Sequence, residues 1–403
     1  MSLDLIKKND TVVSSSLVDT KHHARYALLT IYFFSGFVFA TLFSRMPALR
    51  DIYHLDYAQM GLLPFCMSIG SLVCMPFCAN LANKYGSNRL TEMGYVVAML
   101  FILLPIMPSV YLLYPLCMIY GAVASIYDIA INGNSILVEN SYKRAILSKF
   151  HAIYYVGTSL GALFSILFIS FHVSLPVHFS VASIFVFCEL SVVRPFLLKE
   201  RPKRQAAAEP FHLLFPKGLL LLLAFVALFS RVIEGGLNNW STTYMNSVIS
   251  LPQNLAPVGL AVYAAFMAVG RFFGDIIRNR YSSPFIIMVC AMCTVVGLGV
   301  MIMSTTVALS MSGLLFCGLG MSCLVPVIYS MGGSQADVSP GTGIAMINTV
   351  SGTGFFFGPY IIGLIGNWKG LRMSFMYVLL LGCAMLFLSF LLWNKSGRTK
   401  RID

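Results

Sequence analysis

An acid, an amide and an imidazole interrupt a strongly apolar part of this sequence. Asp128 and Asn132 are four residues apart, which places them on one face of a helix, and His151 opens the next apolar run. An ionised carboxylate inside a membrane costs on the order of 3 kcal/mol, so such a group usually has a partner or a function. We interpret Asp128 and His151 as proton-coupling residues and Asn132 as a hydrogen-bonding neighbour and substrate ligand. The alternative is a polar clamp that ties two helices together.

A second polar group occupies a later apolar run. Arg231 and Glu234 are three residues apart and Asn238 follows one turn later, so the three side chains share a helix face. Glu234 is suited to proton coupling or to accepting substrate hydroxyls, and an arginine in a cavity favours an acid over a neutral sugar. The competing interpretation is a fixed ion pair between Arg231 and Glu234. Asn348, in another apolar run, is a further candidate for substrate binding.

The elements that position these groups are expected to be membrane-spanning helices. The 403 residues are 58% hydrophobic and 10% charged, whereas soluble domains are about 25% charged. Each apolar run is close to the ~20 residues that cross a bilayer as a helix. We therefore expect an all-α integral membrane protein with twelve spans, at approximately 26–45, 58–82, 89–109, 112–137, 150–171, 176–197, 217–240, 257–278, 283–304, 307–330, 342–366 and 371–393.

The distribution of positive charge predicts the orientation of these spans. Most of the 27 Lys and Arg residues lie in the segments that share a side with the N-terminus. The opposite side has Arg45, Arg50, Lys369 and Arg372. We expect the protein in the inner membrane of the cell. Because cytoplasmic segments are enriched in Lys and Arg, both termini are expected on the cytoplasmic side. Orientation accounts for the net charge of +12, so we expect no nucleic-acid partner.

The longest polar interruption, residues 198–216, divides the spans into six and six. Its charged, Pro- and Ala-containing composition is typical of a linker. We expect an N-terminal tail (1–25), a six-helix bundle (26–197), the linker (198–216), a second six-helix bundle (217–393) and a C-terminal tail (394–403). The two halves have a similar arrangement of spans and polar segments, as in many transporters with internal repeats.

The clearest similarity between the halves is a pair of polar segments, 79–90 and 270–281, which follow the second span of each half. Such equivalent segments are typical of an internal repeat, and the family resemblance given below implies a gating role for them. The first segment has Asn83 where the second has an acid. The candidate gating residues are Asn83 and Arg89 in the first segment, and Arg271, Gly274, Asp275 and Arg278 in the second.

Two further features suggest moving parts. Arg45 ends the first span, where it either anchors the helix at the interface or latches an outer gate. Gly358 and Pro359 fall inside the eleventh span, and a Gly-Pro pair bends a helix, so we expect a hinge there.

These features together resemble the major facilitator superfamily over roughly residues 26–393. The segments 79–90 and 270–281 resemble the loop motif of that superfamily. Other stretches resemble a narrower branch, the fucose-permease-like permeases and a group of poorly characterised bacterial inner-membrane members. Those stretches are Ser44 to Arg50, Asp128 to Asn132 with Ser148, Phe150 and His151, Glu234-Gly235 with Trp240-Ser241, Gly318 to Pro326, and Gly358-Pro359. The sequence departs from this branch at Asn239, where an acid is usual, and at Cys323, where an asparagine is usual.

The resemblance and the polar groups together predict a secondary active transporter. We expect a small polar metabolite (a sugar, sugar acid or organic acid) to cross the membrane by proton symport with alternating access. Proton-coupled export of a metabolite, a siderophore-like compound or a drug is the alternative, and a membrane sensor is a remote one. The chain has no P-loop, HExxH or GxSxG motif in a plausible context, so we expect no enzyme activity.

The expected partners follow from this interpretation. They are a small-molecule substrate, protons and membrane lipid, and the chain is expected to act as a monomer. The ten cysteines lie in apolar runs, which indicates packing residues rather than ligands. We expect neither a metal nor another cofactor.

Overall fold

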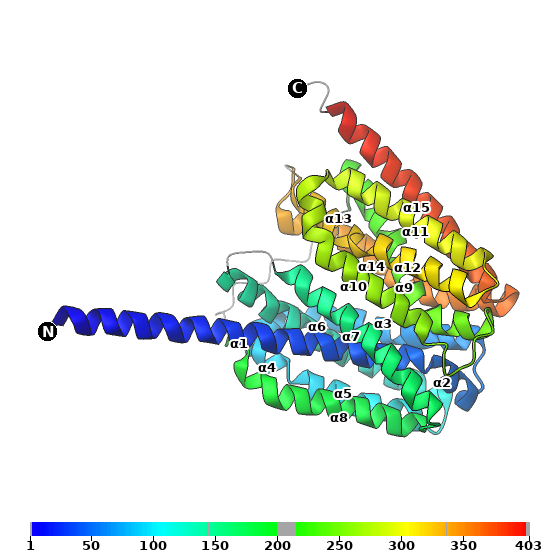
Figure 1. Ribbon diagram of the computed structural model, residues 1–403, viewed down its shortest axis with the longest axis horizontal. Helices are drawn as coiled ribbons and strands as arrows, with labels where there is room; N and C mark the ends of the chain where they lie inside the picture. The colour runs from blue at the N-terminus through cyan, green and yellow to red at the C-terminus, as the bar shows by residue number, and fades with distance from the viewer. Residues whose placement is uncertain (1, 143–145, 200–214, 336, 400–403) are drawn as a thin grey trace.

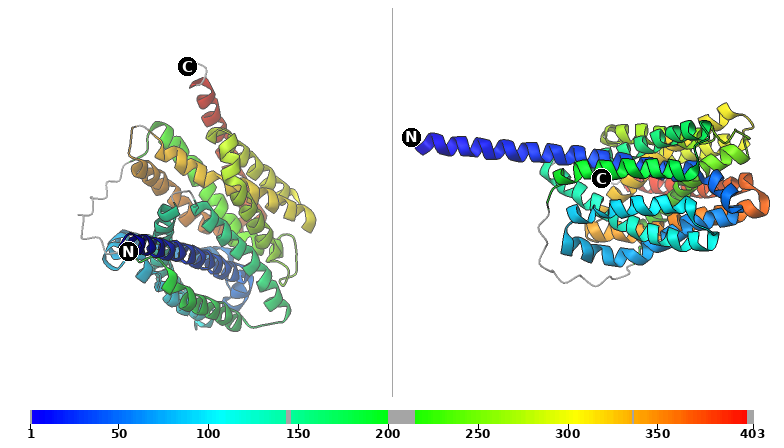
Figure 2. Two further views of the ribbon diagram at one scale, coloured as in Figure 1. Left: turned by 60° about the vertical axis from the view of Figure 1, so that its left-hand side comes forward. Right: turned by 90° about the horizontal axis from the view of Figure 1, so that it is seen from below.

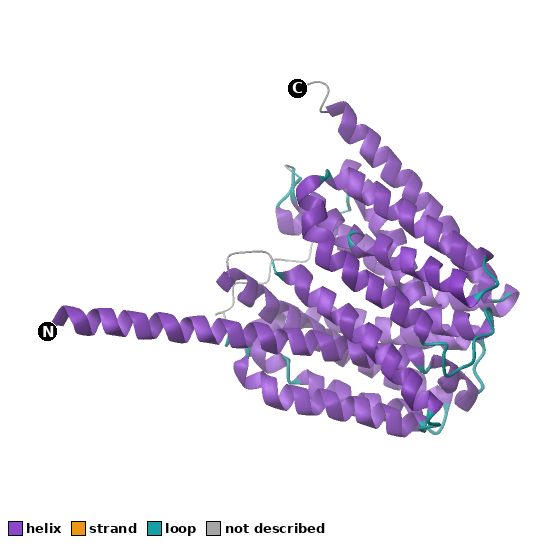
Figure 3. Cartoon of the chain, viewed as in Figure 1, coloured by secondary structure: helices purple, strands orange, loops and turns teal. Residues whose placement is uncertain are grey.

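The computed structural model describes residues 2–142, 146–199, 215–335 and 337–399. Within these residues every regular element is a helix, as Figure 3 shows. The expected linker, 198–216, lies for the most part outside the described residues.

Twelve described helical segments are long and apolar enough to cross a membrane. This confirms the all-α membrane fold, and the observed segments overlap the predicted spans in order. Their bounds are Thr20–Ser44, Tyr57–Cys78, Ser87–Ile106, Val110–Tyr142, Leu147–Ser170, Leu175–Phe196, Gly218–Ser247, Val258–Arg280, Ser283–Met303, Val307–Gly333, Gly341–Lys369 and Leu371–Lys395.

The first eight α-helices and two short 3₁₀ turns form the N-terminal helices. They share extensive contacts, above all between α1 and α7 and between α3 and α6. In chain order they are α1 (Ser2–Ser44), α2 (Met46–Tyr53), α3 (Tyr57–Tyr85), α4 (Ser87–Leu90), α5 (Met93–Leu103), η1 (Leu104–Ile106), α6 (Val110–Tyr142), α7 (Leu147–Ser170), α8 (Leu175–Val193) and η2 (Arg194–Phe196).

The remaining seven α-helices form the C-terminal helices, which pack chiefly through α9 against α14 and α11 against α12. They are α9 (Gly218–Ser247), α10 (Val258–Arg280), α11 (Ser283–Met303), α12 (Val307–Ser322), α13 (Leu324–Gly333), α14 (Pro340–Lys369) and α15 (Leu371–Thr399). Figure 1 shows both groups side by side, with their helices roughly aligned.

The first helix is longer than the span it contains. Helix α1 begins at Ser2, so the polar segment expected as a tail continues the first span as one helix. It projects well beyond the other helices in Figures 1 and 2. The sequence before the span contains neither Gly nor Pro, and those are the residues that most strongly oppose a helix interior.

The tenth span is divided into two helices. Helix α12 ends at Ser322 and α13 starts at Leu324, with Cys323 between them. Pro326 explains the break, because a proline ring lacks an N–H and clashes with the carbonyl four residues earlier, here that of Ser322. The divided span brings Tyr329 of α13 into the site described below.

Glycines allow the tightest helix contacts. A Cβ atom at Gly157 of α7 would overlap the backbone oxygen of Phe33 in α1, so these two helices touch backbone to backbone. Between the two groups of helices, a Cβ at Gly363 of α14 would overlap the backbone oxygen of Tyr57 in α3. Small residues permit such approaches in membrane proteins.

Contacts between the two groups run mainly along α7 against α10 and α3 against α14. At the end that carries α2, hydrogen bonds cross between the groups: Gln253 Nε2 donates to Asp51 Oδ2 (3.3 Å) and Asn367 Nδ2 to Asp56 Oδ2 (3.3 Å). Further toward the end that carries the N-terminus, Asp128 and Asn348 are exposed. The two groups are thus tied together at the α2 end.

Candidate functional site

Arg231 and Glu234 form an ion pair on α9. The Nη1 atom of Arg231 lies 3.5 Å from Oε2 of Glu234, with the two side chains 28% and 6% exposed. The pairing is local, because residues three apart meet on one helix face. The predicted polar face is therefore present, and its guanidinium retains access to solvent.

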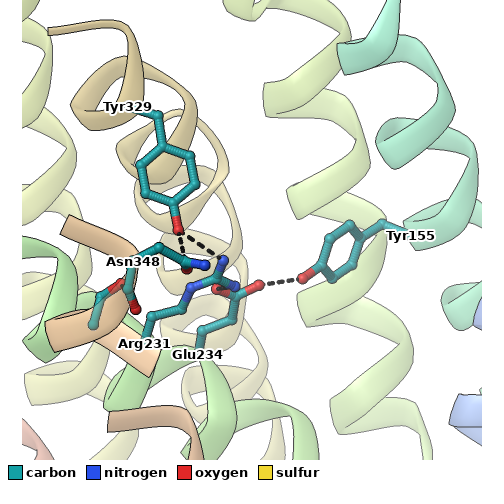
Figure 4. A network of polar contacts seen from close by, with 6 residues as sticks. Tyr155, Arg231, Glu234, Tyr329 and Asn348 are labelled. Atoms are coloured by element: carbon teal, nitrogen blue, oxygen red, sulfur yellow. Dashed lines mark hydrogen bonds and ion pairs between the residues drawn. The ribbon is translucent and has the colours of Figure 1, made fainter. Parts of the chain in front are cut away.

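A tyrosine from the N-terminal helices completes the environment of Glu234. The hydroxyl of Tyr155 on α7 donates to Oε1 of Glu234 at 2.6 Å (Figure 4). A hydrogen bond from a hydroxyl to a carboxylate is shorter and stronger than one between two neutral groups. The bond joins residues 79 positions apart and links the two groups of helices at the buried carboxylate.

The guanidinium of Arg231 contacts α13 and is connected through it to α14. Its Nη2 atom lies 3.4 Å from the hydroxyl of Tyr329 on α13, and that hydroxyl donates to Oδ1 of Asn348 on α14 at 2.8 Å. Figure 4 shows these side chains converging on one point. Four helices, α7, α9, α13 and α14, therefore contribute to one polar network, and Asn348 belongs to it.

Asn238 lies one turn further along α9 and is buried. It is within hydrogen-bonding reach of the Tyr155 hydroxyl. Its Oδ1 atom has no hydrogen-bond partner among the described residues. Buried polar atoms are usually satisfied, so this oxygen is available to a bound molecule or to water.

Arg271 also belongs to this cluster. Its guanidinium carbon lies 4.8 Å from the centre of the Tyr155 ring, a cation–π contact, and its buried Nε atom has no partner among the described residues. The sequence placed Arg271 in a gating segment. In the structure it lies within α10, next to the tyrosine that binds Glu234.

The predicted group on the N-terminal helices is a chain of polar contacts. Asn132 donates to the backbone oxygen of Asp128 at 2.8 Å, and its own oxygen accepts from the Tyr32 hydroxyl at 2.9 Å. The His151 ring packs edge-on against Tyr32, with centres 5.3 Å apart. Helices α1, α6 and α7 are thus joined. The exposed Asp128 lies within electrostatic range of Arg231, so the two predicted groups lie in the same region of the protein.

The other predicted gating residues have different surroundings. Asn83 and Arg89 are exposed near the ends of α3 and α4. Arg278 donates to the Ser330 hydroxyl at 2.8 Å, and a Cβ at Gly274 would lie 3.2 Å from the Cys323 sulfur. Asp275 is half-buried and takes part in no ion pair among the described residues. The second segment therefore connects α10 to the divided tenth span.

Gly358 and Pro359 lie inside α14, at the contact between the two groups of helices. The Trp240 indole donates to the Pro359 oxygen at 3.1 Å, and a Cβ at Gly61 of α3 would lie 3.0 Å from that same oxygen. A bend here would move α14 relative to α3 of the N-terminal helices and α9 of the C-terminal helices. Arg45 is buried and donates to the Val173 oxygen at 2.9 Å, a contact within the N-terminal helices.

The sequence did not reveal two residues that organise the site. Tyr155 lies among several aromatic residues, and its pattern does not separate it from packing residues. Glu139 at the end of α6 accepts from the backbone N–H groups of Ile146 and Leu147 at 2.7 and 2.8 Å. It thereby caps α7 and sets its position. An acid shortly before a helix start was the available signal.

The arrangement supports binding and proton exchange. It offers carboxylates, guanidinium groups, hydroxyls and amides around a partly exposed arginine. Among the described residues no three metal-ligating side chains cluster.

Relatives of this chain include two proteins with transporter names. It is 26% identical to an uncharacterised transporter, y4wD, of Sinorhizobium fredii (strain NBRC 101917 / NGR234) over 86% of this chain and 92% of the relative. It is 26% identical to an uncharacterised MFS-type transporter of Yersinia pestis over 89% and 91%. The membrane protein MosC of Rhizobium meliloti is 24% identical over 88% of both chains.

Solved structures share the fold at low identity. A bacterial homologue of the human lysosomal transporter Spinster superimposes with a TM-score of 0.70 at 14% identity, over 91% of this chain and 95% of that one. The nucleoside transporter NupG has a TM-score of 0.73 at 12% identity, over 92% and 99%. Finally, the sequence pattern of the Major Facilitator Superfamily matches residues 28–351. The chain therefore belongs to the Major Facilitator Superfamily and is a multi-pass membrane transport protein.

Proposed function

We propose that this protein is a proton-coupled symporter of a small metabolite that carries both hydroxyl groups and an acid group. The class includes sugar acids and hydroxylated organic acids. The carrying observation is the position of Glu234, whose two oxygens bind Tyr155 from one group of helices and Arg231 from its own. The carboxylate thus links the contact between the two groups to the Arg231 guanidinium.

The acid group of the substrate is assigned to Arg231. Its contact with Glu234 is long, at 3.5 Å, and its side chain is 28% exposed. A guanidinium presents a planar fork of donors that matches a carboxylate. A substrate acid would therefore compete with Glu234 for the same donors, while Asn348 and Asn238 supply amides for hydroxyls.

The competition between the two carboxylates suggests how protons are coupled. When Glu234 is ionised it occupies Arg231, and when Glu234 binds a proton its attraction to the guanidinium is lost. Arg231 is then free to bind the substrate acid. Proton and substrate would therefore bind together, which is the requirement for symport. Asp128, within electrostatic range of Arg231, is a second proton-binding group in this proposal. His151 is a third, and it is connected to Asp128 through Tyr32 and Asn132.

Alternating access would follow from rocking of two six-helix units, 26–197 and 217–393. With the predicted orientation, the end closed by Asp51, Gln253, Asp56 and Asn367 is the outer one, and the site is reached from the cytoplasm. These hydrogen bonds must break when the outer side opens. We propose Gly358 and Pro359 as the hinge within α14.

Transport into proteoliposomes tests the proposal. Purified protein is reconstituted, an inward proton gradient is applied, and uptake of radiolabelled sugar acids, organic acids, sugars and amino acids is measured. The expected result is accumulation of an acid that collapses when a protonophore removes the gradient. Accumulation of neutral sugars alone would contradict the assigned role of Arg231. Accumulation driven by an outward proton gradient would show proton antiport, as expected for an exporter.

A further inference from the structure

Arg45 is a buried arginine that has no acidic partner. It links α1 to α2 and is 6% exposed. Its Nη2 atom donates to the backbone oxygen of Val173 at 2.9 Å, whereas its buried Nε atom has no partner among the described residues. Arginine is charged at every ordinary pH, so this corner of the fold contains a fixed positive charge.

A buried histidine lies within electrostatic range of Arg45. His178 is 0% exposed, and neither of its ring nitrogens has a hydrogen-bond partner among the described residues. Its ring stacks on Phe168, with centres 4.4 Å apart and an angle of 23° between the planes. The histidine is therefore held in place by aromatic packing, with its polar atoms available to another group.

The beginning of α8 adds a third feature that can interact with an anion. This helix of 19 residues starts at Leu175, and no side chain caps it. Pro176 contributes no N–H, but those of Leu175 and Val177 lack intrahelical acceptors, and such a helix start attracts negative charge. Arg45 binds the carbonyl of Val173, two residues before α8, and His178 lies in its first turn.

Among the described residues, no carboxylate forms an ion pair with Arg45. The ion pairs among the described residues are Arg194 with Glu92 and Arg231 with Glu234. The acids at the same end of the fold have other partners, since Asp51 accepts from Gln253 and Asp56 from Gln59 and Asn367. A buried charge without a counter-charge costs several kcal/mol.

We infer that Arg45, His178 and the first turn of α8 bind a small monovalent inorganic anion, of which chloride is the representative. The unpartnered Nε of Arg45 and a ring N–H of His178 donate to the anion, and the start of α8 faces it. The anion neutralises the arginine and joins the α1–α2 corner to the α7–α8 turn. Its role is structural and independent of the substrate proposed for the Arg231 site.

A water molecule is the competing occupant, because it also satisfies an N–H donor. Water differs from an anion in that it does not respond to salt composition. Arg50, five positions after Arg45, provides a matched control. It is half-buried, its Nε donates to the Leu55 oxygen at 3.3 Å, and its guanidinium lies 4.7 Å from the Tyr57 ring centre. Both residues are positively charged at the same end of the fold, but only Arg45 has a buried unpartnered donor.

Thermal unfolding of the detergent-purified full chain tests the inference. Chloride replaces gluconate at constant ionic strength, and the midpoint of unfolding is followed. We expect a saturable rise in the midpoint for the wild type and for Arg50→Gln. For Arg45→Gln we expect the apparent chloride affinity to fall at least about tenfold, since a charge-assisted hydrogen bond contributes about 1.5–3 kcal/mol. Equal responses in all three proteins would overturn the site.

A direct measurement avoids dependence on variant folding. Wild-type crystals grown with bromide in place of chloride are measured at the bromine absorption edge. An anomalous peak between Arg45 and His178 supports the inference. A water-like density without an anomalous peak at this position, in crystals where bromide is bound elsewhere, overturns it.

Discussion

The hydroxyl of Tyr155 donates to Oε1 of Glu234 at 2.6 Å, and this bond joins α7 of the N-terminal helices to α9 of the C-terminal helices. The other carboxylate oxygen is the one that faces Arg231. One acidic side chain therefore contacts both a tyrosine of the other group of helices and the arginine of its own helix. The first predictions concern this acid and its partners.

Glu234→Gln should uncouple transport from protons. Glutamine keeps the shape and accepts from Tyr155, but it has no charge to hold Arg231 and no proton to exchange. We expect proton-driven accumulation to fall to the level of liposomes without protein, whereas exchange of labelled for unlabelled substrate persists. Uptake by the wild type should decline as external pH rises, and uptake by the variant should not. Glu92→Gln, which changes the exposed ion pair with Arg194, is the matched control and should transport normally.

Tyr155→Phe should slow transport without unfolding the protein. The change removes the hydroxyl bonded to Glu234 but keeps the ring that lies under Arg271. A hydrogen bond to a charged group contributes about 1.5–3 kcal/mol, which corresponds to a decrease of roughly tenfold or more in the rate of exchange. Tyr95→Phe removes a hydroxyl whose partner is the exposed Ser191, so it controls for loss of a phenol. Normal exchange by Tyr155→Phe would show that the bond has no part in transport.

Arg231→Gln should change which substrates bind. We expect loss of affinity for acids and retention of affinity for neutral compounds, measured by ligand-induced shifts in the unfolding midpoint. If the arginine only neutralises Glu234, the result differs. Arg231→Gln and Glu234→Gln would then each destabilise the protein, and the double change would restore stability because it leaves no unpaired charge. The double variant thus separates binding from structure.

Asp128→Asn tests the acid on the N-terminal helices. The amide preserves size, so the backbone contact with Asn132 should survive. We expect the pH dependence of proton-driven uptake to be altered while the unfolding midpoint stays close to that of the wild type. An unchanged pH profile would exclude Asp128 from proton coupling. A large loss of stability with normal coupling would identify the acid as the polar clamp.

Gly157→Ala should destabilise the contact between α1 and α7. Its Cβ would overlap the Phe33 backbone oxygen, and a backbone atom cannot move aside as a flexible side chain does. Overpacking of this kind costs about 1–3 kcal/mol, so the unfolding midpoint should fall. Gly299→Ala is the matched control, because a Cβ there has no neighbour within 4 Å. That change should leave the midpoint unchanged or raise it, since alanine favours helices.

By itself the sequence determined the membrane class, the twelve spans and the helix face shared by Arg231, Glu234 and Asn238. These are local properties, because a run of apolar residues and a spacing of three or four follow directly from helix geometry. The identification of Asn348 as a polar residue worth testing was also local. The break at Cys323 was in principle readable from Pro326, although the tenth span was predicted as continuous.

Only the tertiary structure decided which polar groups meet. Tyr155 reaches Glu234 from 79 positions away, and Tyr329 on α13 joins Arg231 on α9 to Asn348 on α14. Arg271, a gating candidate in the sequence, lies against the Tyr155 ring, and Arg45 donates to a backbone oxygen rather than to an acid. Helical periodicity determines which residues share a face, but the rotation of each helix and its neighbours depend on packing along its whole length. Glycine contacts such as Gly157 against Phe33 allow the close helix approaches on which that packing depends.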